Sequence, residues 1–491
     1  MTLLLAIDQS TSATKALLVD DRGAVLDAAS LDHRQHYPRA GWVEHDAEEI
    51  WRNTLSVCRK LCERHSAEVA EVGAVCLTNQ RETFLVFDRA TGEPLAPAIV
   101  WQCRRGDSIC EELRGAGVDG PLREKTGLRV DSYFSGPKIT WLMRERPDLA
   151  ARAREGAAAV STVDAYLVHR LTGGEVYAAD PTNASRTLLY DIRRRAWDDE
   201  LCAAFEVPLD ALPEVRDSTA EFGQTDLGGA LPRPVPIRGV MGDSQASLFA
   251  QRCYAPGEAK ATFGTGTSVL LNVGPEFVPP AEGAVGALAW VAGGEPTYAW
   301  EGLINYSAAT LAWLKDGLGL IQSIDEVEPL AASVPDSDGV YLVPAFAGLS
   351  APHWRPDARA AIVGMTGRTG KAHVVRAALE SIALQVADVV EMLAASGARP
   401  ESLRVDGGPT RNRLLMQMTA DVARCELVAT KETNLSALGA AMAGILGLGL
   451  VDSLDGLREL PRETSRYTPQ ADPAAVDKLL TGWRDAVAHV L

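Results

Sequence analysis

The sequence predicts an α/β protein of two large domains that repeat one structural pattern. The chain has 491 residues, enough for two large domains or three small ones. Residues 3–20 run as apolar strand, polar turn and apolar strand, and residues 259–274 repeat that order. A helical pattern follows in each half, at 46–65 and at 371–396. The second half therefore repeats the first at the scale of a domain.

Composition narrows the classes of protein that remain. Hydrophobic residues make up 46% of the chain and charged residues 23%, as in ordinary folded proteins. A net charge of −17 without a basic run argues against nucleic acid or a membrane surface as partner, so a phosphorylated ligand would need locally concentrated positive charge. The eight cysteines form no C-x-x-C pair and the eight histidines are scattered. We therefore expect reduced thiols, no zinc site and a cytoplasmic protein.

The elements of the first half follow in a clear order. Strand 3–7 leads through "DQSTSATK" to the strand "ALLVD" and then to "AVLDAAS". The helix at 46–65 begins with a capping-box pattern of Asp46 and Glu49. Its apolar stripe is predicted to consist of Ile50, Trp51, Leu55, Cys58, Leu61 and Cys62.

The boundary between the halves is expected near residue 250, where "QRCYAPGEAK" ends a helix at Pro256-Gly257. This gives domains 1–250 and 251–491. In the second half, the helix at 371–396 is followed by the strand "LRVDG", a helix from about Asn412 and a last helix over about 473–489.

One uncharged stretch, 433–451, is long and apolar enough to resemble a membrane-spanning segment. Four glycines interrupt it and four further positions are alanine, which favours a buried helix of about three turns followed by a turn. The N-terminus "MTLLLAID" lacks the basic region of a signal peptide. We expect no membrane partner.

Each half carries a small, hydroxyl-rich turn that can donate hydrogen bonds to phosphate oxygens. The first contains Thr11, Ser12 and Thr14, followed by Lys15, which supplies the positive charge. Asp8 precedes it and suits Mg²⁺, because this ion prefers one or two carboxylates together with phosphate. The second turn is "GTGTS" at 264–268. An ordinary hairpin turn is the alternative for either, but two such turns in corresponding places favour phosphate binding.

Common nucleotide motifs are not matched. "MTGRTGKA" lacks the first glycine of a P-loop, and "GTGTSV" is not G-x-G-x-x-G. A third loop, "RVDGGPTRN", places Gly407-Gly408 between a strand and a helix, where backbone can approach adenine or ribose. The alternative is a glycine turn capped by Thr410 or Asn412.

The stretch "VCLTNQRETFLVF" at 75–87 places Arg81 beside Glu82 at the turn between two apolar strands. Arginine only donates hydrogen bonds and an ionised carboxylate only accepts them, so the pair can grip neighbouring hydroxyls of a polyol. A surface ion pair is the alternative, with a contribution of about 0–1 kcal/mol. Trp101 and Tyr133 can supply an apolar wall and one more hydroxyl, although either can be ordinary core.

Asp243 follows a strand and begins a helix in "GVMGDSQASLF". Capping the helix is one interpretation. The other is a general base at the carboxyl end of a strand, because phosphoryl transfer needs alignment, Mg²⁺ and an acceptor for the hydroxyl proton.

These segments together resemble the FGGY carbohydrate kinase family over about residues 3–450. The resemblance is carried by "DQSTSATK", "TNQRET", "IVWQCRR", "GLRVDSYFSGPK", "TNASRTLLYDI", "GDSQASLF", "FGTGTS", "VPAFAGLSAPHW" and "RVDGGPTRN". "TNQRET" and "VWQCRR" are similar to the glycerol kinase branch. The resemblance implies two ribonuclease-H-like domains of the actin-like ATPase superfamily with a cleft between them, the first holding acceptor and phosphates and the second the nucleotide. It also implies Mg·ATP-dependent phosphorylation of a terminal hydroxyl, and leaves a homodimer or homotetramer open.

By match of motif, the resemblance assigns roles to individual positions. The acceptor would contact Arg81, Glu82, Trp101, Tyr133, Asp243, Ser244 and Ser268, with Asp243 as catalytic base. The nucleotide would contact Thr11, Ser12, Ala13, Lys15, Gly264, Thr265, Gly266, Ala308, Ala312, Gly408 and Asn412. Asp8 would hold the metal ion.

Several positions depart from the family's pattern. Ser10 replaces a glycine, Ser244 a glutamine and Ser268 a phenylalanine that lines the glycerol carbons, while Ala308 and Ala312 replace a glycine and a glutamine. We expect a larger, wetter acceptor pocket.

Glycerol is the expected acceptor, with erythritol, dihydroxyacetone or xylulose as alternatives. A chaperone-like ATPase and a serine acyl enzyme, from S-x-x-K at residues 12–15, are competing functions.

Overall fold

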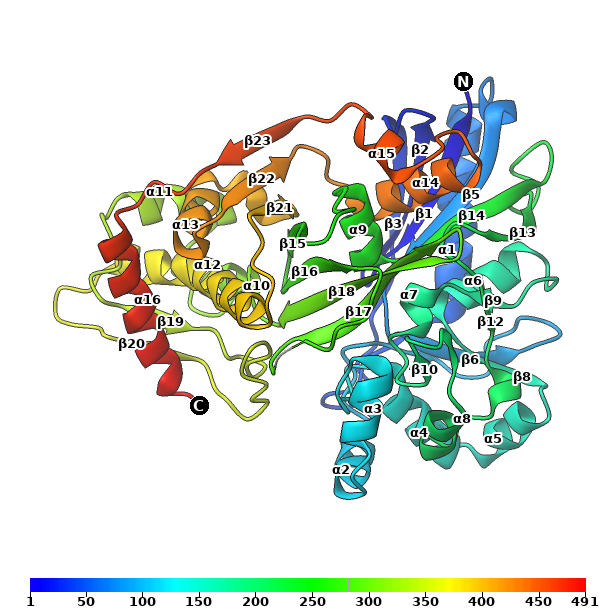
Figure 1. The fold of residues 1–491 in the computed structure, drawn as a ribbon, viewed down its shortest axis with the longest axis horizontal. Coiled ribbons are helices and arrows are strands. Elements are labelled where there is room, and N and C mark those ends of the chain that lie inside the picture. The colour runs from blue at the N-terminus through cyan, green and yellow to red at the C-terminus, as the bar shows by residue number, and fades with distance from the viewer. Residues whose placement is uncertain (281) are drawn as a thin grey trace.

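The computed structural model describes residues 1–280 and 282–491 and contains two large sheets with the same central strand order (Figure 1). In the first sheet the order is β3 (Val25–Asp32), β2 (Ala13–Asp20), β1 (Leu3–Gln9), β5 (Val72–Asn79) and β14 (Val235–Gly242). The first three strands are antiparallel, whereas β1, β5 and β14 are parallel. Strand β13 (Glu221–Thr225) extends the sheet beyond β14.

The second sheet repeats this arrangement. Its central order is β18 (Glu295–Ile304), β16 (Thr267–Gly274), β15 (Ala259–Phe263), β21 (Ser402–Asp406) and β22 (Glu426–Thr430), again three antiparallel strands followed by parallel ones. Edge strands are β17 (Val285–Ala292) and β23 (Thr464–Tyr467). The predicted α/β class and the repeat between the halves are thus confirmed, and the doubled order is that of two ribonuclease-H-like units.

A smaller α/β region lies mostly between β5 and β14 in the chain, and one of its strands, at residues 44–45, precedes β5. Its sheet has the order β4 (Glu44–His45), β7 (Ala98–Ile99), β6 (Phe84–Asp88) and β8 (Ala158–Thr162). Its helices are α2 (Asp107–Gly115), α3 (Asp119–Thr126), α4 (Ser135–Glu145), α5 (Pro147–Arg154), α7 (Pro181–Ala184) and α8 (Asp199–Ala204). The apolar runs at 75–87 therefore do not pair with each other: the turn at Arg81-Glu82 passes the chain from the large sheet to the small one.

Helices cover the first sheet on both faces, and one of them comes from the far end of the chain. Helices α1 (Ala47–Arg64) and α6 (Val163–Leu171) pack on one face. Helix α14 (Leu435–Gly447) packs on the other, beside the blue strands of Figure 1. Helix α9 (Asp243–Ala250) contacts α14 and also β15, β16 and β17, so these two helices join the sheets. The stripe predicted for α1 is partly wrong, because Trp51 and Leu55 are only half-buried.

Small residues allow α14 to approach its neighbours closely. A side chain at Gly439 would place Cβ 1.8 Å from the Ala246 carbonyl oxygen, and Gly239, with φ of +74°, would place it 2.2 Å from the Ala440 carbonyl oxygen. Gly439 is thus required by packing, and the burial of α14 confirms the predicted buried helix. No helix in the described part of the chain has the length and apolar character needed to cross a membrane.

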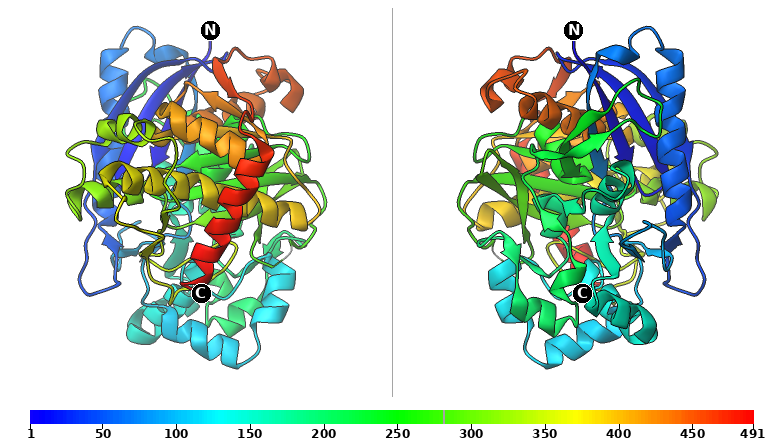
Figure 2. Two further views of the ribbon diagram at one scale, coloured as in Figure 1. Left: turned by 90° about the vertical axis from the view of Figure 1, so that its left-hand side faces the viewer. Right: turned by 90° about the vertical axis from the view of Figure 1, so that its right-hand side faces the viewer.

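The remaining elements complete the second half, whose red C-terminal helix is turned toward the viewer in the left view of Figure 2. They are α10 (Ala309–Asp316), α11 (Val327–Ala332), β19 (Tyr341–Val343), β20 (Ala361–Val363), α12 (Lys371–Ala395), α13 (Arg413–Ala423), α15 (Leu454–Arg458) and α16 (Pro473–Ala488). In the first half, short strands β9 (Ala178–Ala179), β10 (Tyr190–Asp191), β11 (Ala196–Trp197) and β12 (Glu214–Val215) pair locally. All eight cysteines are free and buried, as predicted.

Candidate active site

The turn that carries the opposite charges is strained. Glu82 adopts a φ of +60°, a region that non-glycine residues seldom occupy. The Thr83 amide donates to the Arg81 carbonyl across 2.7 Å, and Ser135 Oγ donates to the Glu82 carbonyl across 2.9 Å. Such backbone conformations persist where surrounding contacts enforce them, and they concentrate at functional sites. This turn is therefore shaped by tertiary contacts, which no local sequence signal shows.

Arg81 is almost fully buried and contacts carboxylates from both halves of the chain. Its Nη2 lies 2.9 Å from Glu301 Oε1 on β18, and its Nε lies 3.3 Å from Asp243 Oδ1 at the start of α9. Its Nη1 donates to Gln245 Oε1 across 3.2 Å. The alternative of a surface ion pair is wrong, because Arg81 joins the turn to α9 and to the second sheet.

A second arginine, Arg186, completes this network. Its Nε donates to Glu82 Oε1 across 2.6 Å, and its Nη1 lies 2.8 Å from Glu301 Oε2. Sequence analysis missed Arg186, Glu301 and Gln245. A signal was present for two of them, since Arg186 and Glu301 stand as single charges within the apolar stretches "SRTLLY" and "YAWEGLI".

Burial and pairing set the charge states of this network. Burial would lower the pKa of the Arg81 guanidinium, but Glu301 and Glu82 outweigh it and raise that pKa above its ordinary value. Burial also opposes ionisation of Glu301, yet Arg186 and Arg81 hold its pKa at about 2. For Glu82, burial outweighs the attraction of Arg81 and Arg186, and its pKa is raised. Glu301 is therefore the carboxylate that chiefly balances the two arginines.

Two polar groups of the predicted acceptor site remain available to a ligand. Within the described residues, Glu82 Oε1 accepts from Arg186, whereas Glu82 Oε2 and the Tyr133 hydroxyl make no hydrogen bond that the structure records. The Tyr133 ring lies 5.4 Å from the Trp101 ring, centroid to centroid, so together they form an aromatic wall. Trp101 Nε1 donates to Thr11 Oγ1 across 3.0 Å. This hydrogen bond connects the aromatic wall to the turn after β1, the first predicted phosphate loop.

Asp243 occupies the first turn of α9, and its carboxylate is about one-third exposed. The N-cap of the helix is Gly242, so the interpretation of Asp243 as the cap is wrong. One carboxylate oxygen accepts from the Ser244 amide across 2.6 Å and also faces Arg81. Ser244, predicted to line the acceptor site, therefore contacts Asp243 through its backbone.

The first phosphate loop joins β1 to β2, with Asp8 and Lys15 directly opposite each other. Burial raises the pKa of Asp8 to about 6; Lys15 lowers it and Asp243 raises it further. Asp8 Oδ1 is buried without a hydrogen-bond partner in the described structure. A buried, unpaired carboxylate oxygen beside a second carboxylate suits a hard cation such as Mg²⁺. Of the loop itself, Ser12 is exposed, Thr11 is half-buried and Ala13 is buried.

The second predicted phosphate loop joins β15 to β16 and accepts backbone hydrogen bonds from the start of α10. The Ala308 amide donates to the Gly264 carbonyl across 3.1 Å, and the Ser307 amide donates to the Thr265 carbonyl across 2.8 Å. A side chain at Gly266 would meet the Ile304 carbonyl at 2.4 Å, so the loop is tightly packed from behind. Ala312 lies one turn further along α10. The predicted residues of 264–266 and 308–312 are thus neighbours.

The third loop lies against the second. Gly407 has a φ of +101°, and a Cβ there would lie 1.9 Å from the Phe263 carbonyl oxygen, so only glycine fits. A Cβ at Gly408 would meet open space, which leaves its backbone accessible. Asn412 is the N-cap of α13, its Oδ1 accepting from the Leu415 amide across 2.8 Å. The capping alternative is confirmed for Asn412, whose amide nitrogen stays free for a further contact within the described structure.

Ser268 is placed beside the charge network. Its hydroxyl donates to Glu301 Oε1 across 3.0 Å, and it is half-buried. Lys260 on β15 is fully buried near Asp243, and burial lowers the pKa of its ammonium group. In the described residues, no three His, Cys, Asp or Glu side chains are close enough together to bind one metal ion. A cation in the candidate site would therefore be bound by a single carboxylate together with the phosphates of a bound nucleotide.

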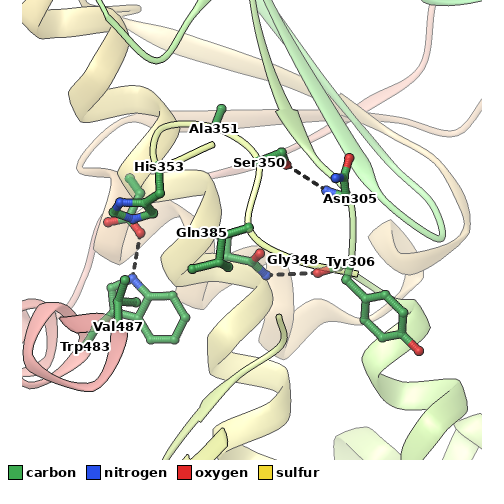
Figure 3. A pocket seen from close by; sticks show the side chains of 11 residues that line it. Asn305, Tyr306, Gly348, Ser350, Ala351, His353, Gln385, Trp483 and Val487 are labelled. Carbon is green, nitrogen blue, oxygen red and sulfur yellow. Dashed lines mark hydrogen bonds between the residues drawn. The ribbon is translucent and has the colours of Figure 1, made fainter. Parts of the chain in front are cut away.

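A small cavity in the second half is separate from these residues (Figure 3). It holds about 10 Å³, roughly one water molecule. Gln385 Nε2 donates to the Tyr306 carbonyl across 3.1 Å, and Trp483 Nε1 donates to Asp388 Oδ2 across 2.7 Å. The cavity is thus part of the packing between α12 and α16.

Comparison with known proteins gives the family. The model of the FGGY family of carbohydrate kinases matches residues 3–250 with its N-terminal domain and residues 259–448 with its C-terminal domain. The chain belongs to the FGGY family of carbohydrate kinases. It is 44% identical over 489 residues to glycerol kinase 1 of Thermotoga maritima, covering 99% of each chain. It is 46% identical over 487 residues to the glycerol kinase of Rhodopirellula baltica, covering 99% of this chain and 90% of that one.

Solved FGGY-type kinases have the same fold. The glycerol kinase of Plasmodium falciparum with ADP superposes with a TM-score of 0.93 at 34% identity, covering 100% of this chain and 98% of that one. A xylulose kinase of Lactobacillus acidophilus superposes with a TM-score of 0.90 at 20% identity, covering 99% of both. The predicted pair of ribonuclease-H-like domains is therefore confirmed, as is membership of a family of sugar and polyol kinases.

Proposed function

We propose that this chain is an ATP-dependent kinase of a small polyol, with glycerol as its acceptor and glycerol 3-phosphate as its product. One observation carries the proposal: Arg81, Glu82, Tyr133 and Asp243 lie together beside both phosphate loops. Full-length similarity to glycerol kinases supports the choice of acceptor.

The acceptor is held by groups of complementary hydrogen-bonding character. Glu82 Oε2 accepts from one hydroxyl, the remaining N–H groups of Arg81 donate to a neighbouring one, and the Tyr133 hydroxyl supplies a third contact. The aromatic wall of Trp101 and Tyr133 packs on the carbon chain. These groups orient the acceptor so that its terminal hydroxyl faces Asp243.

Asp243 accepts the proton of that hydroxyl as the oxygen attacks the terminal phosphate of ATP, and ADP leaves as the bond to the bridging oxygen breaks. Arg81 Nε, 3.3 Å from Asp243 Oδ1, orients the carboxylate. Thr11, Ser12, Lys15 and Thr265 donate to the phosphates, while Gly408 and Asn412 lie at the adenine end.

Asp8 would hold Mg²⁺ beside the nucleotide's phosphates. When bound, this ion neutralises charge that builds up on the transferred phosphoryl group. The unpaired Oδ1 of Asp8 is the feature that fits it.

The test is ATP turnover against glycerol, dihydroxyacetone, erythritol, xylitol and xylulose. Acceptor-stimulated ADP release, fastest with glycerol, is expected; no stimulation by any of the five would refute the proposal. Asp243→Asn should lower kcat at least about 10²-fold while ATP still binds, because the base is lost and the phosphate loops are intact. Retained turnover would reject Asp243 as the base.

A further inference from the structure

An arginine-lined pocket of about 260 Å³ opens on the second sheet. It lies at the opposite end of α9 from Asp243. Its charged lining consists of Arg252, Arg404, Arg458, Arg462, Arg466 and Glu426. Such a concentration of cations stands out in a chain whose net charge is −17. Local positive charge of this kind attracts anions even when the protein as a whole is acidic.

Strand register builds one wall of this pocket. Val428 on β22 pairs with Arg404 on β21 and with Arg466 on β23, so the two arginines lie on the same face, one on either side of Val428. Arg466 Nη1 lies 2.8 Å from Glu426 Oε2, and its side chain is 65% exposed. The wall thus presents two cations toward one face.

The opposite wall comes from segments far away in the chain. Arg252 follows α9, Arg458 ends α15, and Arg462 lies between α15 and β23. Arg252 Nη1 donates to the carbonyls of Arg458 and Leu460 across 2.9 and 2.7 Å. These contacts fix the Arg252 side chain against the backbone of residues 458–460.

Backbone carbonyls satisfy hydrogen bonds without neutralising charge. Glu258 is the carboxylate behind the pocket, and it pairs with both Arg404, at 2.9 Å, and Arg458, at 2.7 Å. Glu426 pairs with Arg466, and Asp455, 94% exposed, lies 3.7 Å from Arg458 Nε at the rim, so three carboxylates face five arginines. The pocket therefore keeps an excess of positive charge.

Two features of the arginines favour the binding of an anion. Arg252 Nε is buried and has no hydrogen-bond partner in the described structure. Burial, together with the neighbouring Arg252 and Arg404, lowers the pKa of the Arg462 guanidinium to about 10. Cations held this close repel one another, and a bound anion relieves that repulsion. The planar fork of arginine is suited to phosphate and carboxylate oxygens.

We propose that this pocket binds a small, multiply charged oxyanion, a phosphate ester or a polycarboxylate, at a place separate from the active site. Asp243 begins α9 and Arg252 follows its other end. The eight residues of this helix span about 12 Å, so one ligand of this size does not reach both places. The proposal does not depend on which polyol the enzyme phosphorylates.

Calorimetric titration tests the proposal in the full chain. Inorganic phosphate and citrate are the two probes, at constant ionic strength set with chloride. The active site is saturated with glycerol, Mg²⁺ and a non-hydrolysable ATP analogue, so that the phosphate loops are occupied, and the heat of the same titration without protein is subtracted because citrate also binds Mg²⁺. Saturable binding of one anion per chain is expected, and the tighter probe identifies phosphate or carboxylate as the preferred class. No saturable heat from either probe would overturn the proposal.

Two variants place the binding in this pocket. Arg466→Gln should weaken binding about tenfold, because one charge-assisted hydrogen bond is lost. The matched control is Arg424→Gln, another half-exposed arginine, which pairs with Asp477 elsewhere. Glu426→Gln should tighten binding, since it removes the carboxylate that competes with the anion. Equal affinities for wild type, Arg466→Gln and Glu426→Gln would overturn the assignment, and circular dichroism confirms that each variant is folded.

Discussion

Replacing Glu301 by glutamine tests whether one buried carboxylate holds the two halves of the active site together. Its side chain is fully buried and lies 2.9 Å from Arg81 Nη2 and 2.8 Å from Arg186 Nη1. The pKa of Glu301 lies at about 2 against an ordinary 4.5, a shift equivalent to about 3 kcal/mol. Removing one partner of a buried ion pair typically costs about 3–5 kcal/mol. Both routes give a destabilisation of about 3 kcal/mol for Glu301→Gln.

The assay is urea-induced unfolding at pH 7, with Glu295→Gln as the matched control because Glu295 lies exposed on the same strand. The control should stay within about 0.5 kcal/mol of wild type. Because the folded-state pKa of Glu301 is depressed, its contribution is present above pH 4.5 and is lost as pH falls toward 2. The difference between wild type and Glu301→Gln should therefore shrink near pH 3. Equal unfolding midpoints for Glu301→Gln and Glu295→Gln at pH 7 would refute the reasoning.

Three further predictions follow from single side chains. Ser268→Phe should raise the ratio of kcat/KM for glycerol over erythritol about tenfold, because the ring fills space beside the acceptor; an unchanged ratio would contradict this. Gly439→Ala should destabilise the protein by about 1–3 kcal/mol in urea unfolding, since its Cβ would lie 1.8 Å from the Ala246 carbonyl oxygen. Burial raises the pKa of Asp388 to about 6, so the folded state loses stability as pH rises from about 4 to 6. Asp388→Asn, which can still accept from Trp483 Nε1, should match wild type near pH 4 in thermal unfolding and exceed it at pH 7 by up to about 3 kcal/mol.

Local patterns predicted the elements well because periodicity and turn residues act within one segment. Both strand–turn–strand units, the buried helix at 433–451 and the cap at Asn412 are of this kind. Sheet membership is not local, so the runs on either side of Arg81 were expected to meet at one turn, whereas they enter different sheets.

The same distinction explains which residues of the candidate site could be predicted. Asp8, Arg81, Glu82 and Asp243 stand in short motifs whose chemistry can be read from neighbouring residues. Arg186 and Glu301 act through partners 104 and 220 residues away, Glu82 and Arg81 respectively. Their roles depend on the register of β18 and on the strained turn at Glu82, neither of which the sequence shows.

The charge network also determines which hydrogen bonds the Ser268 hydroxyl can make. A serine in place of a phenylalanine leaves more room, but its hydroxyl hydrogen is committed to Glu301 Oε1 across 3.0 Å. The oxygen therefore offers lone pairs, rather than a proton, toward the acceptor. If Ser268 lines the acceptor site as proposed, a polyol with one more carbon than glycerol would bring an additional hydroxyl donor to this oxygen. Under the proposed function, Glu301 would couple the choice of acceptor to the contact between the two halves, because the carboxylate that binds Arg81 also orients the Ser268 hydroxyl.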